Sequence, residues 1–186
     1  PAPASGAPAW PPLEAGPWIA VLGVPASDCV TAVDADAAAS GSPLGSCFGT
    51  LYAKWLQAGG ARVLGIPYDA SDELLEAILT GANGVLFTGG GLDLVPSTTY
   101  FATAWRIYDR VRRRNLDEGV YVPMHGTCMG FQLLTILAAN DTGVLLHDAF
   151  DSEDLSLPLD LVPGARNASR FIRGLRPDVV DILTTQ

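Results

Sequence analysis

Short apolar runs alternate with segments of helical periodicity between residues 18 and 139. Each run is four to seven residues long and is mainly apolar, which is typical of strands covered on both faces. Such strands are expected inside a sheet rather than on the surface of a sandwich. We therefore predict strands over four segments: 18–24, 62–66, 84–87 and 120–124.

Apolar residues recur at spacings of three and four between these runs, as they do on one face of a helix. The best marked helix starts at Ser71, a capping residue type, continues with two acidic residues, and precedes Gly81. We predict helices over four segments: 48–56, 71–81, 101–114 and 131–139. Strands that alternate with helices at this interval predict a parallel sheet between helices, a three-layer α/β/α fold.

The N-terminal segment differs in composition from the rest of the chain. Residues 1–17 hold six of the fourteen prolines, together with many alanines, and such a segment favours extended conformations with little to bury. We interpret it as a Pro/Ala-rich arm. The length of 186 residues supports one core, so residues 18–186 are predicted to form a single domain.

The balance of charges excludes several classes of partner. The chain has 11 Lys and Arg against 20 Asp and Glu, which gives a net charge of −9. An acidic surface repels phosphate backbones and anionic lipids, so we expect no nucleic-acid partner. We also expect no membrane insertion, because no apolar run approaches the roughly 18 residues that a membrane span needs.

The cysteines and two asparagines bear on the cellular compartment. Three cysteines without a CxxC pair predict neither a disulfide scaffold nor a metal site. Asn140 and Asn167 stand in N-x-S/T patterns and are candidate glycosylation sites, although such triplets also arise by chance. In an oxidising compartment, Cys29 could pair with Cys47 and leave Cys128 free.

Cys128 has the sequence context of a nucleophile. It stands between Gly126 and Gly130, after a predicted strand and before a predicted helix, and glycines are needed on both sides of so tight a turn. The positive end of the helix favours a thiolate. Residues 89–91, a triple glycine, could present N–H groups to an oxyanion together with the N–H of Met129. This arrangement predicts acyl transfer through a thioester.

The alternative is that Cys128 is a small buried residue and that its glycines only form turns. Free cysteine is among the most buried residue types, so this is the ordinary interpretation of an isolated cysteine. The triple glycine at 89–91, in the loop after the neighbouring strand, favours the interpretation of Cys128 as a nucleophile. The two interpretations differ in whether the sulfur is exposed and near the triple glycine.

Several segments resemble the γ-glutamyl hydrolases, members of the class I glutamine amidotransferase-like superfamily. Residues 122–132, VPMHGTCMGFQ, resemble the nucleophile segment, and residues 83–94 resemble the oxyanion loop. Residues 52–63 are similar to the first helix and second strand of the family, and residues 154–161 and 169–170 to the stretch after the nucleophile helix. The resemblance implies a class I glutamine amidotransferase-like (flavodoxin-like) fold.

The resemblance also implies a function. The implied protein is a lysosomal, vacuolar or secreted cysteine hydrolase that removes γ-linked glutamates from folylpoly-γ-glutamates without a metal or cofactor. The expected partner is therefore a small-molecule γ-glutamyl substrate. In that scheme Cys128 attacks the γ-amide carbonyl, while Gly90 or Gly91 and Met129 hold the oxyanion. The residues that we assign to substrate binding are Gln132, Ser169 and Arg170.

The chain departs from the family pattern in its histidines. The family's catalytic histidine comes from a C-terminal segment that would follow Gln186. We therefore expect a chain that is incomplete at its C-terminus. Its expected partner is the missing C-terminal fragment or, in a homodimer, a second copy of the chain. Of the two histidines present, His125 lies on the strand side of Cys128 and is interpreted as structural, and His147 lies past the nucleophile helix.

Two substitutions keep other functions open. Gln132 stands where the hydrolases commonly have Glu and is more like the amidotransferases, and Cys47 stands where they commonly have Tyr. The alternatives are a catalytically inactive member that serves as an interaction or structural subunit, and a glutamine amidotransferase domain. The arginines of 106–114 are interpreted as a solvated helix end rather than an anion site. The acidic residues of 148–154 are interpreted as a solvated loop rather than a calcium site.

Overall fold

The structure is a computed structural model, and it describes residues 16–29, 45–146, 149–151 and 154–185. The chain divides into two compact units, residues 1–145 and residues 146–186, and each is described by itself. Most of the predicted arm lies outside the described residues. The single domain 18–186 stays a prediction.

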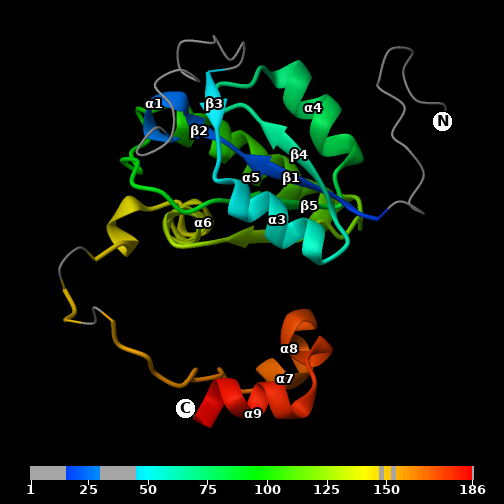
Figure 1. The fold of residues 1–186 in the computed structure, drawn as a ribbon, viewed down its shortest axis with the longest axis vertical. Coiled ribbons are helices and arrows are strands. Elements are labelled where there is room, and N and C mark those ends of the chain that lie inside the picture. The colour runs from blue at the N-terminus through cyan, green and yellow to red at the C-terminus, as the bar shows by residue number, and fades with distance from the viewer. Residues whose placement is uncertain (1–15, 30–44, 147–148, 152–153, 186) are drawn as a thin grey trace. The chain divides into compact units, whose positions relative to one another are not determined.

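Four parallel strands form the central sheet of the first unit, in the order β4-β1-β5-β6 (Figure 1). Ala20 of the central strand β1 lies opposite Leu64 on one side and Val85 on the other. Every residue of β5 is buried, as is expected for a parallel strand with side chains packed on both faces. The strands are β1 (Trp18–Leu22), β4 (Arg62–Ile66), β5 (Gly84–Phe87) and β6 (Met124–Gly126). The strands predicted at 62–66 and 84–87 are confirmed.

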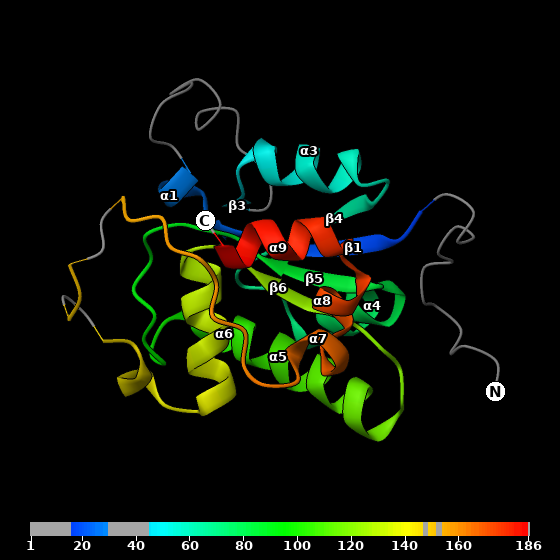
Figure 2. The ribbon, with the colours of Figure 1, turned by 90° about the horizontal axis from the view of Figure 1, so that it is seen from below.

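Helices cover both faces of this sheet. One face carries α3 (Thr50–Ala58), and the opposite face carries α4 (Asp72–Gly81), α5 (Thr99–Asp117) and α6 (Met129–Ala139), as Figure 2 shows. The predicted three-layer α/β/α fold with a mostly parallel central sheet is confirmed. Because the strands are parallel, their carboxyl ends share one edge, where ligands bind in folds of this type.

On the face of the sheet opposite α3, helices α4 and α5 both begin at capping residues. Ser71 Oγ accepts a hydrogen bond from the Leu74 N–H at 3.3 Å, so the predicted start of α4 is confirmed. Thr98 caps α5 in the same way, accepting from the Phe101 N–H at 3.2 Å. Helix α5 is longer than the segment 101–114 that apolar periodicity predicts, because its capping residue Thr98 lies before the first apolar residue of that pattern.

The strand predicted at 120–124 is wrong in its position, since β6 begins only at Met124. The Asn115 side chain binds both backbone groups of Val122, accepting from its N–H at 2.7 Å and donating to its carbonyl at 2.9 Å. Pro123 has no N–H to offer a neighbouring strand. The segment before Met124 is therefore held by α5 rather than by a full strand ladder.

The strand predicted at 18–24 ends at Leu22. Gly23 N–H still bonds to the Ile66 carbonyl at 2.8 Å, but the chain then leaves the sheet. The short strand β2 (Val24–Pro25) pairs in antiparallel fashion with β3 (Ser46–Cys47), and α1 (Ala26–Cys29) follows β2. The sequence analysis predicted no strand between residues 25 and 47 and so missed this second, two-stranded sheet.

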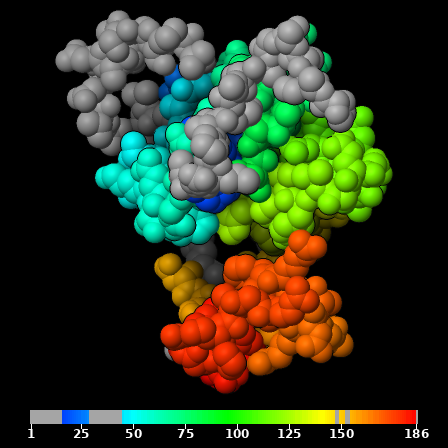
Figure 3. Space-filling model, turned by 90° about the vertical axis from the view of Figure 1, so that its right-hand side faces the viewer, coloured from blue at the N-terminus to red at the C-terminus, as the bar shows by residue number. Residues whose placement is uncertain are grey.

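The described part of the second unit contains the short helices α7 (Ala165–Ala168), α8 (Arg170–Gly174) and α9 (Pro177–Thr185), whose atoms are coloured from orange to red in Figure 3. An ion pair between Arg166 and Asp181, at 3.5 Å, joins α7 to α9. Leu159 N–H donates to the Leu183 carbonyl at 2.7 Å and so ties the preceding extended segment to α9. The sequence pattern predicted none of these helices.

Candidate active site

Cys128 lies at a sharp bend between β6 and α6. Its backbone has φ 52° and ψ −115°, outside the regions that L-residues ordinarily adopt, and its side chain is exposed. A strained, exposed residue between a strand and a helix is the local geometry of a nucleophile elbow. The interpretation of Cys128 as a buried core residue is therefore wrong.

The glycines beside Cys128 are required by close packing. A Cβ on Gly126 would lie 2.6 Å from the Phe131 nitrogen, and a Cβ on Gly130 would lie 2.6 Å from the Phe87 carbonyl carbon. Real Cβ atoms do not approach backbone so closely, so any side chain would force the bend open. These contacts hold the first turn of α6 against the end of β5.

The triple glycine after β5 lies against the elbow. A Cβ built on Gly89 would lie 3.3 Å from Cys128 Cβ, and one on Gly90 would lie 3.0 Å from Met129 Cε. Leu92 N–H also contacts Met129 Sδ at 3.1 Å. The sequence-predicted nucleophile and glycine loop are thus brought together, although they are about 40 positions apart in the chain.

Three main-chain donors lie at this junction. Met129 is the first residue of α6, so its N–H has no acceptor inside the helix. Within the part of the chain that the structure describes, the N–H groups of Gly90 and Gly91 have no protein acceptor, and both residues are exposed. The positive end of α6 also points at this position. These groups can stabilise negative charge that develops beside Cys128.

A cavity of about 300 Å³ opens beside the glycine loop. Its wall combines the triple glycine with residues of three other segments, so it lies at the carboxyl edge of the sheet. The residues that line it are Val24, Asp28, Phe48, Gly49, Tyr52, Thr88, Gly89, Gly90, Gly91 and Leu92. Tyr52 is one polar side chain here that the sequence analysis missed, because its spacing on α3 is that of a core residue.

The other predicted residues near the elbow are Gln132 and His125. Gln132 is exposed one turn after Cys128, and its N–H donates to the Cys128 carbonyl at 3.1 Å. The ring of His125 lies 5.5 Å from that of Trp55, centre to centre. Among the described residues no hydrogen bond joins Cys128 to a histidine, and His147 lies outside them.

Ser169 and Arg170 lie in the second unit, and Cys128 lies in the first. Ser169 Oγ accepts from the Ile172 N–H at 3.2 Å and caps α8, which accounts for a serine at this position. The two glycosylation candidates, Asn140 at the end of α6 and Asn167 in α7, are both exposed. Their assigned roles stay predictions.

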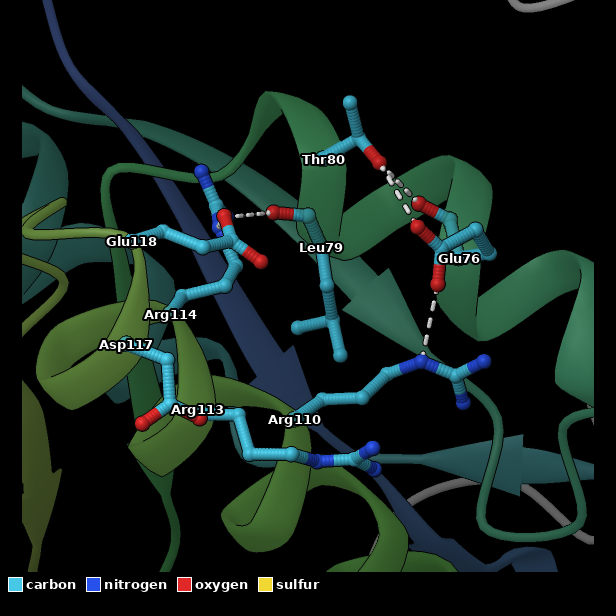
Figure 4. A pocket seen from close by; sticks show the side chains of 8 residues that line it. All are labelled: Glu76, Leu79, Thr80, Arg110, Arg113, Arg114, Asp117 and Glu118. Atoms are coloured by element: carbon cyan, nitrogen blue, oxygen red, sulfur yellow. Dashed lines mark hydrogen bonds and ion pairs between the residues drawn. The ribbon is translucent and has the colours of Figure 1, made fainter.

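The arginines of α5 line a larger hollow of about 510 Å³ between α4 and α5 (Figure 4). Arg110 pairs with Glu76 at 2.8 Å, and Arg114 donates to the Leu79 carbonyl. Arg113 pairs with Asp109 of its own helix. Arg110 and Arg114 therefore join α5 to α4, and Arg113 is held on its own helix. Since these guanidinium groups are paired with acceptors of the chain itself, this hollow is not the candidate site.

The described residues contain neither a candidate metal site nor a membrane-spanning helix. Within the described ranges, no three His, Cys, Asp or Glu side chains are grouped so that they could bind a metal ion. Two members of the acidic segment, Asp148 and Glu153, lie outside those ranges. No helix in the described residues has the length and apolar character needed to cross a membrane.

Comparison with known proteins identifies the family. Residues 21–152 match the family model described as Peptidase C26. Gamma-glutamyl hydrolase 1 of Arabidopsis thaliana is 33% identical over 134 residues, which are 72% of this chain and 37% of that protein. Human gamma-glutamyl hydrolase is 33% identical over 120 residues, 64% of this chain and 36% of its own length.

Gamma-glutamyl hydrolase B of Dictyostelium discoideum is 37% identical over 109 residues, 59% of this chain and 30% of that protein. The chain thus spans about a third of the length of these curated relatives. The family match takes in the sheet, the glycine loop and the elbow at Cys128. The chain therefore belongs to the peptidase C26 family.

Proposed function

We propose that this protein is a cysteine hydrolase that cleaves the γ-glutamyl bonds of folylpoly-γ-glutamates. The observation that carries the proposal is the exposed side chain of Cys128 on a strained turn beside a glycine loop, where the N–H groups of Gly90 and Gly91 have no protein acceptor among the described residues. Relatives named gamma-glutamyl hydrolases support the bond type. The folate part of the substrate rests on the family resemblance alone.

The proposed reaction proceeds in two steps. Cys128 attacks the γ-amide carbonyl, and the carbonyl oxygen becomes an oxyanion held by the N–H groups of Met129 and of Gly90 or Gly91. Collapse expels the amine, which takes up a proton, and leaves a thioester that water hydrolyses. The resemblance assigns the proton transfers to a histidine of the family's C-terminal segment.

Substrate recognition is proposed for Gln132, Ser169 and Arg170. Gln132 is exposed on the helix turn that follows the nucleophile, where its amide can meet the glutamyl group. The exposed Arg170 offers a guanidinium that suits the carboxylates of a polyglutamate. The Ser169 hydroxyl oxygen accepts the capping hydrogen bond of α8, and its O–H can still donate a hydrogen bond to the substrate.

We further propose a lysosomal, vacuolar or secreted location with N-glycans at Asn140 and Asn167. Cys47 is disulfide-bonded, which supports an oxidising compartment. The expected pairing of Cys47 with Cys29 stays a prediction, because the Cys29 side chain lies outside the described residues. Glycosidase treatment of the protein from its source would reduce its mass if the two asparagines carry glycans.

The test is cleavage of a folate pentaglutamate, followed by mass spectrometry of the shortened folates and of released glutamate. We expect cleavage by the wild type and a loss of about 10³-fold or more in Cys128→Ala, because the thioester requires the sulfur. Ammonia released from glutamine, with the γ-peptide intact, would instead indicate an amidotransferase. No turnover, with Cys128 alkylated no faster than free cysteine, would overturn the proposal.

A non-catalytic subunit of the same fold is the second candidate. It is favoured by the lack, within the described ranges, of a histidine hydrogen-bonded to Cys128. This candidate predicts that Cys128→Ala changes no activity but that the protein binds another polypeptide of the family. Cleavage in the assay above would contradict it.

A further inference from the structure

Tyr52 of α3 makes a polar contact that its position on a mainly apolar helix face does not explain. Its phenol oxygen accepts a hydrogen bond from the Gly89 N–H at 2.8 Å, across 37 positions of the chain. The side chain is half-buried and lines the cavity beside the triple glycine. The phenol therefore links the helix on one face of the sheet to the loop that follows β5.

The phenol and the nucleophile border the same small space. A Cβ on Gly89 would lie 2.7 Å from Tyr52 Oη and 3.3 Å from Cys128 Cβ. A glycine at this position leaves the space open, so that both side chains reach the loop. Tyr52 is thus placed beside the candidate site rather than in the core.

The glycine loop needs an external restraint. Successive glycines have more conformational freedom than any other residues, and this freedom must be lost when donors are held in fixed positions. The structure shows a contact at each end of the loop: Tyr52 Oη on Gly89 N–H, and Met129 Sδ on Leu92 N–H. Among the residues that the structure describes, no protein acceptor binds the N–H groups of the two exposed glycines between these contacts.

From this arrangement we propose that Tyr52 is a positioning residue of the hydrolase site, which fixes the glycine loop so that its N–H groups receive the oxyanion. The proposal rests on the proposed function. The phenol acts through Gly89 and does not itself exchange a proton with the substrate. Preorganised donors stabilise the transition state more than the bound substrate, so loss of the restraint should lower kcat and leave KM nearly unchanged.

The variant that tests this role is Tyr52→Phe, which keeps the ring and removes the oxygen. We expect kcat for γ-glutamyl cleavage to fall about tenfold, less than the roughly 10²–10³-fold loss on removing an oxyanion donor itself, because Met129 still restrains the loop. Tyr108→Phe is the matched control, since Tyr108 is also half-buried but lies on α5, away from the cavity. It should leave both constants unchanged.

Two reagents separate positioning from general damage to the site. Iodoacetamide alkylates Cys128 by displacement of iodide, which forms no oxyanion, so its rate should be the same in Tyr52→Phe and wild type. An aldehyde analogue of the γ-glutamyl group adds the thiol across its carbonyl, and the former carbonyl oxygen of the hemithioacetal occupies the oxyanion position. Its dissociation constant should rise about tenfold in the variant.

The outcomes distinguish the two proposals. A wild type that neither cleaves the substrate nor binds the aldehyde overturns the proposed function and with it the role of Tyr52. An active wild type whose Tyr52→Phe variant keeps kcat and aldehyde affinity overturns the role of Tyr52 alone. Equal losses in cleavage, aldehyde binding and alkylation would also overturn it, because they would indicate a displaced nucleophile.

Discussion

The strained backbone at Cys128 predicts that a glycine variant at this position is more stable than an alanine variant, which is the reverse of the usual order. Cys128→Ala and Cys128→Gly both remove the sulfur, but only glycine also removes the Cβ that makes φ 52° and ψ −115° unfavourable. Strain of this kind costs about 1–3 kcal/mol. We therefore expect the glycine variant to be the more stable of the two.

The magnitude follows from two opposing contributions. At an unstrained position, glycine is less stable than alanine by about 0.5–1 kcal/mol, because it loses more freedom on folding. The side chain of Cys128 is exposed, so its loss removes little buried surface in either variant. The net advantage of glycine is then about 1 kcal/mol, which corresponds to a rise in Tm of roughly 2–4 °C for a chain of this size.

Urea unfolding followed by tryptophan fluorescence measures this difference, because all four tryptophans lie in the first unit. The control is Ala138→Gly on the exposed side of α6, which should lower the free energy of unfolding by about 1 kcal/mol. If Cys128→Gly is less stable than Cys128→Ala by a similar amount, the elbow is not strained. The inference from backbone geometry to a nucleophile would then lose its basis.

Two further predictions concern packing and charge. Gly130→Ala should lower the free energy of unfolding by about 2 kcal/mol or more, because its Cβ would meet the Phe87 backbone, whereas Gly91→Ala, also in the first unit but with open space around it, should be nearly neutral in the same urea assay. Hydrogen bonds from Arg106, and then Arg110, hold the pKa of Asp72 below its ordinary 3.8. Because its pKa is lowered in the folded state, the ionised Asp72 carboxylate stabilises the fold above pH 3.8, and this stabilisation is lost as the pH falls through the lowered pKa. The Tm of Asp72→Asn should therefore lie slightly below that of the wild type at pH 7 and match it in strong acid. A constant Tm difference across that range would contradict this origin.

The elements with clear local signals were predictable from the sequence. The Ser71 cap and the apolar run of 84–87 each specify a boundary within a few residues, and both are confirmed. The strand near residue 122 was misplaced because its position depends on Asn115, whose amide binds the backbone of Val122. Such a contact is tertiary, so apolar patterning does not contain it.

The site was predictable in part for a related reason. The sequence around Cys128 contains the turn and its glycines, so the elbow could be predicted from local chemistry. Tyr52 could not, because on α3 it is one of several apolar positions at helical spacing, and its polar partner Gly89 is brought near only by the assembled sheet. Two other members of that apolar set, Leu51 and Trp55, are 76% and 56% exposed, so periodicity alone also overestimated the buried face of α3.

The site and the sheet depend on the same close contacts. The position of a side chain on Gly130 is taken by the backbone of Phe87, which is the last residue of β5 and lies directly before Thr88 and the glycine loop. This contact holds the first turn of α6 close to the start of the glycine loop. A substitution that pushed α6 away from β5 would therefore separate the two sets of donors even if the protein stayed folded. Loss of stability and loss of oxyanion binding should then rise together at Gly130, whereas at Tyr52, which restrains only the loop, oxyanion binding should weaken with little loss of stability.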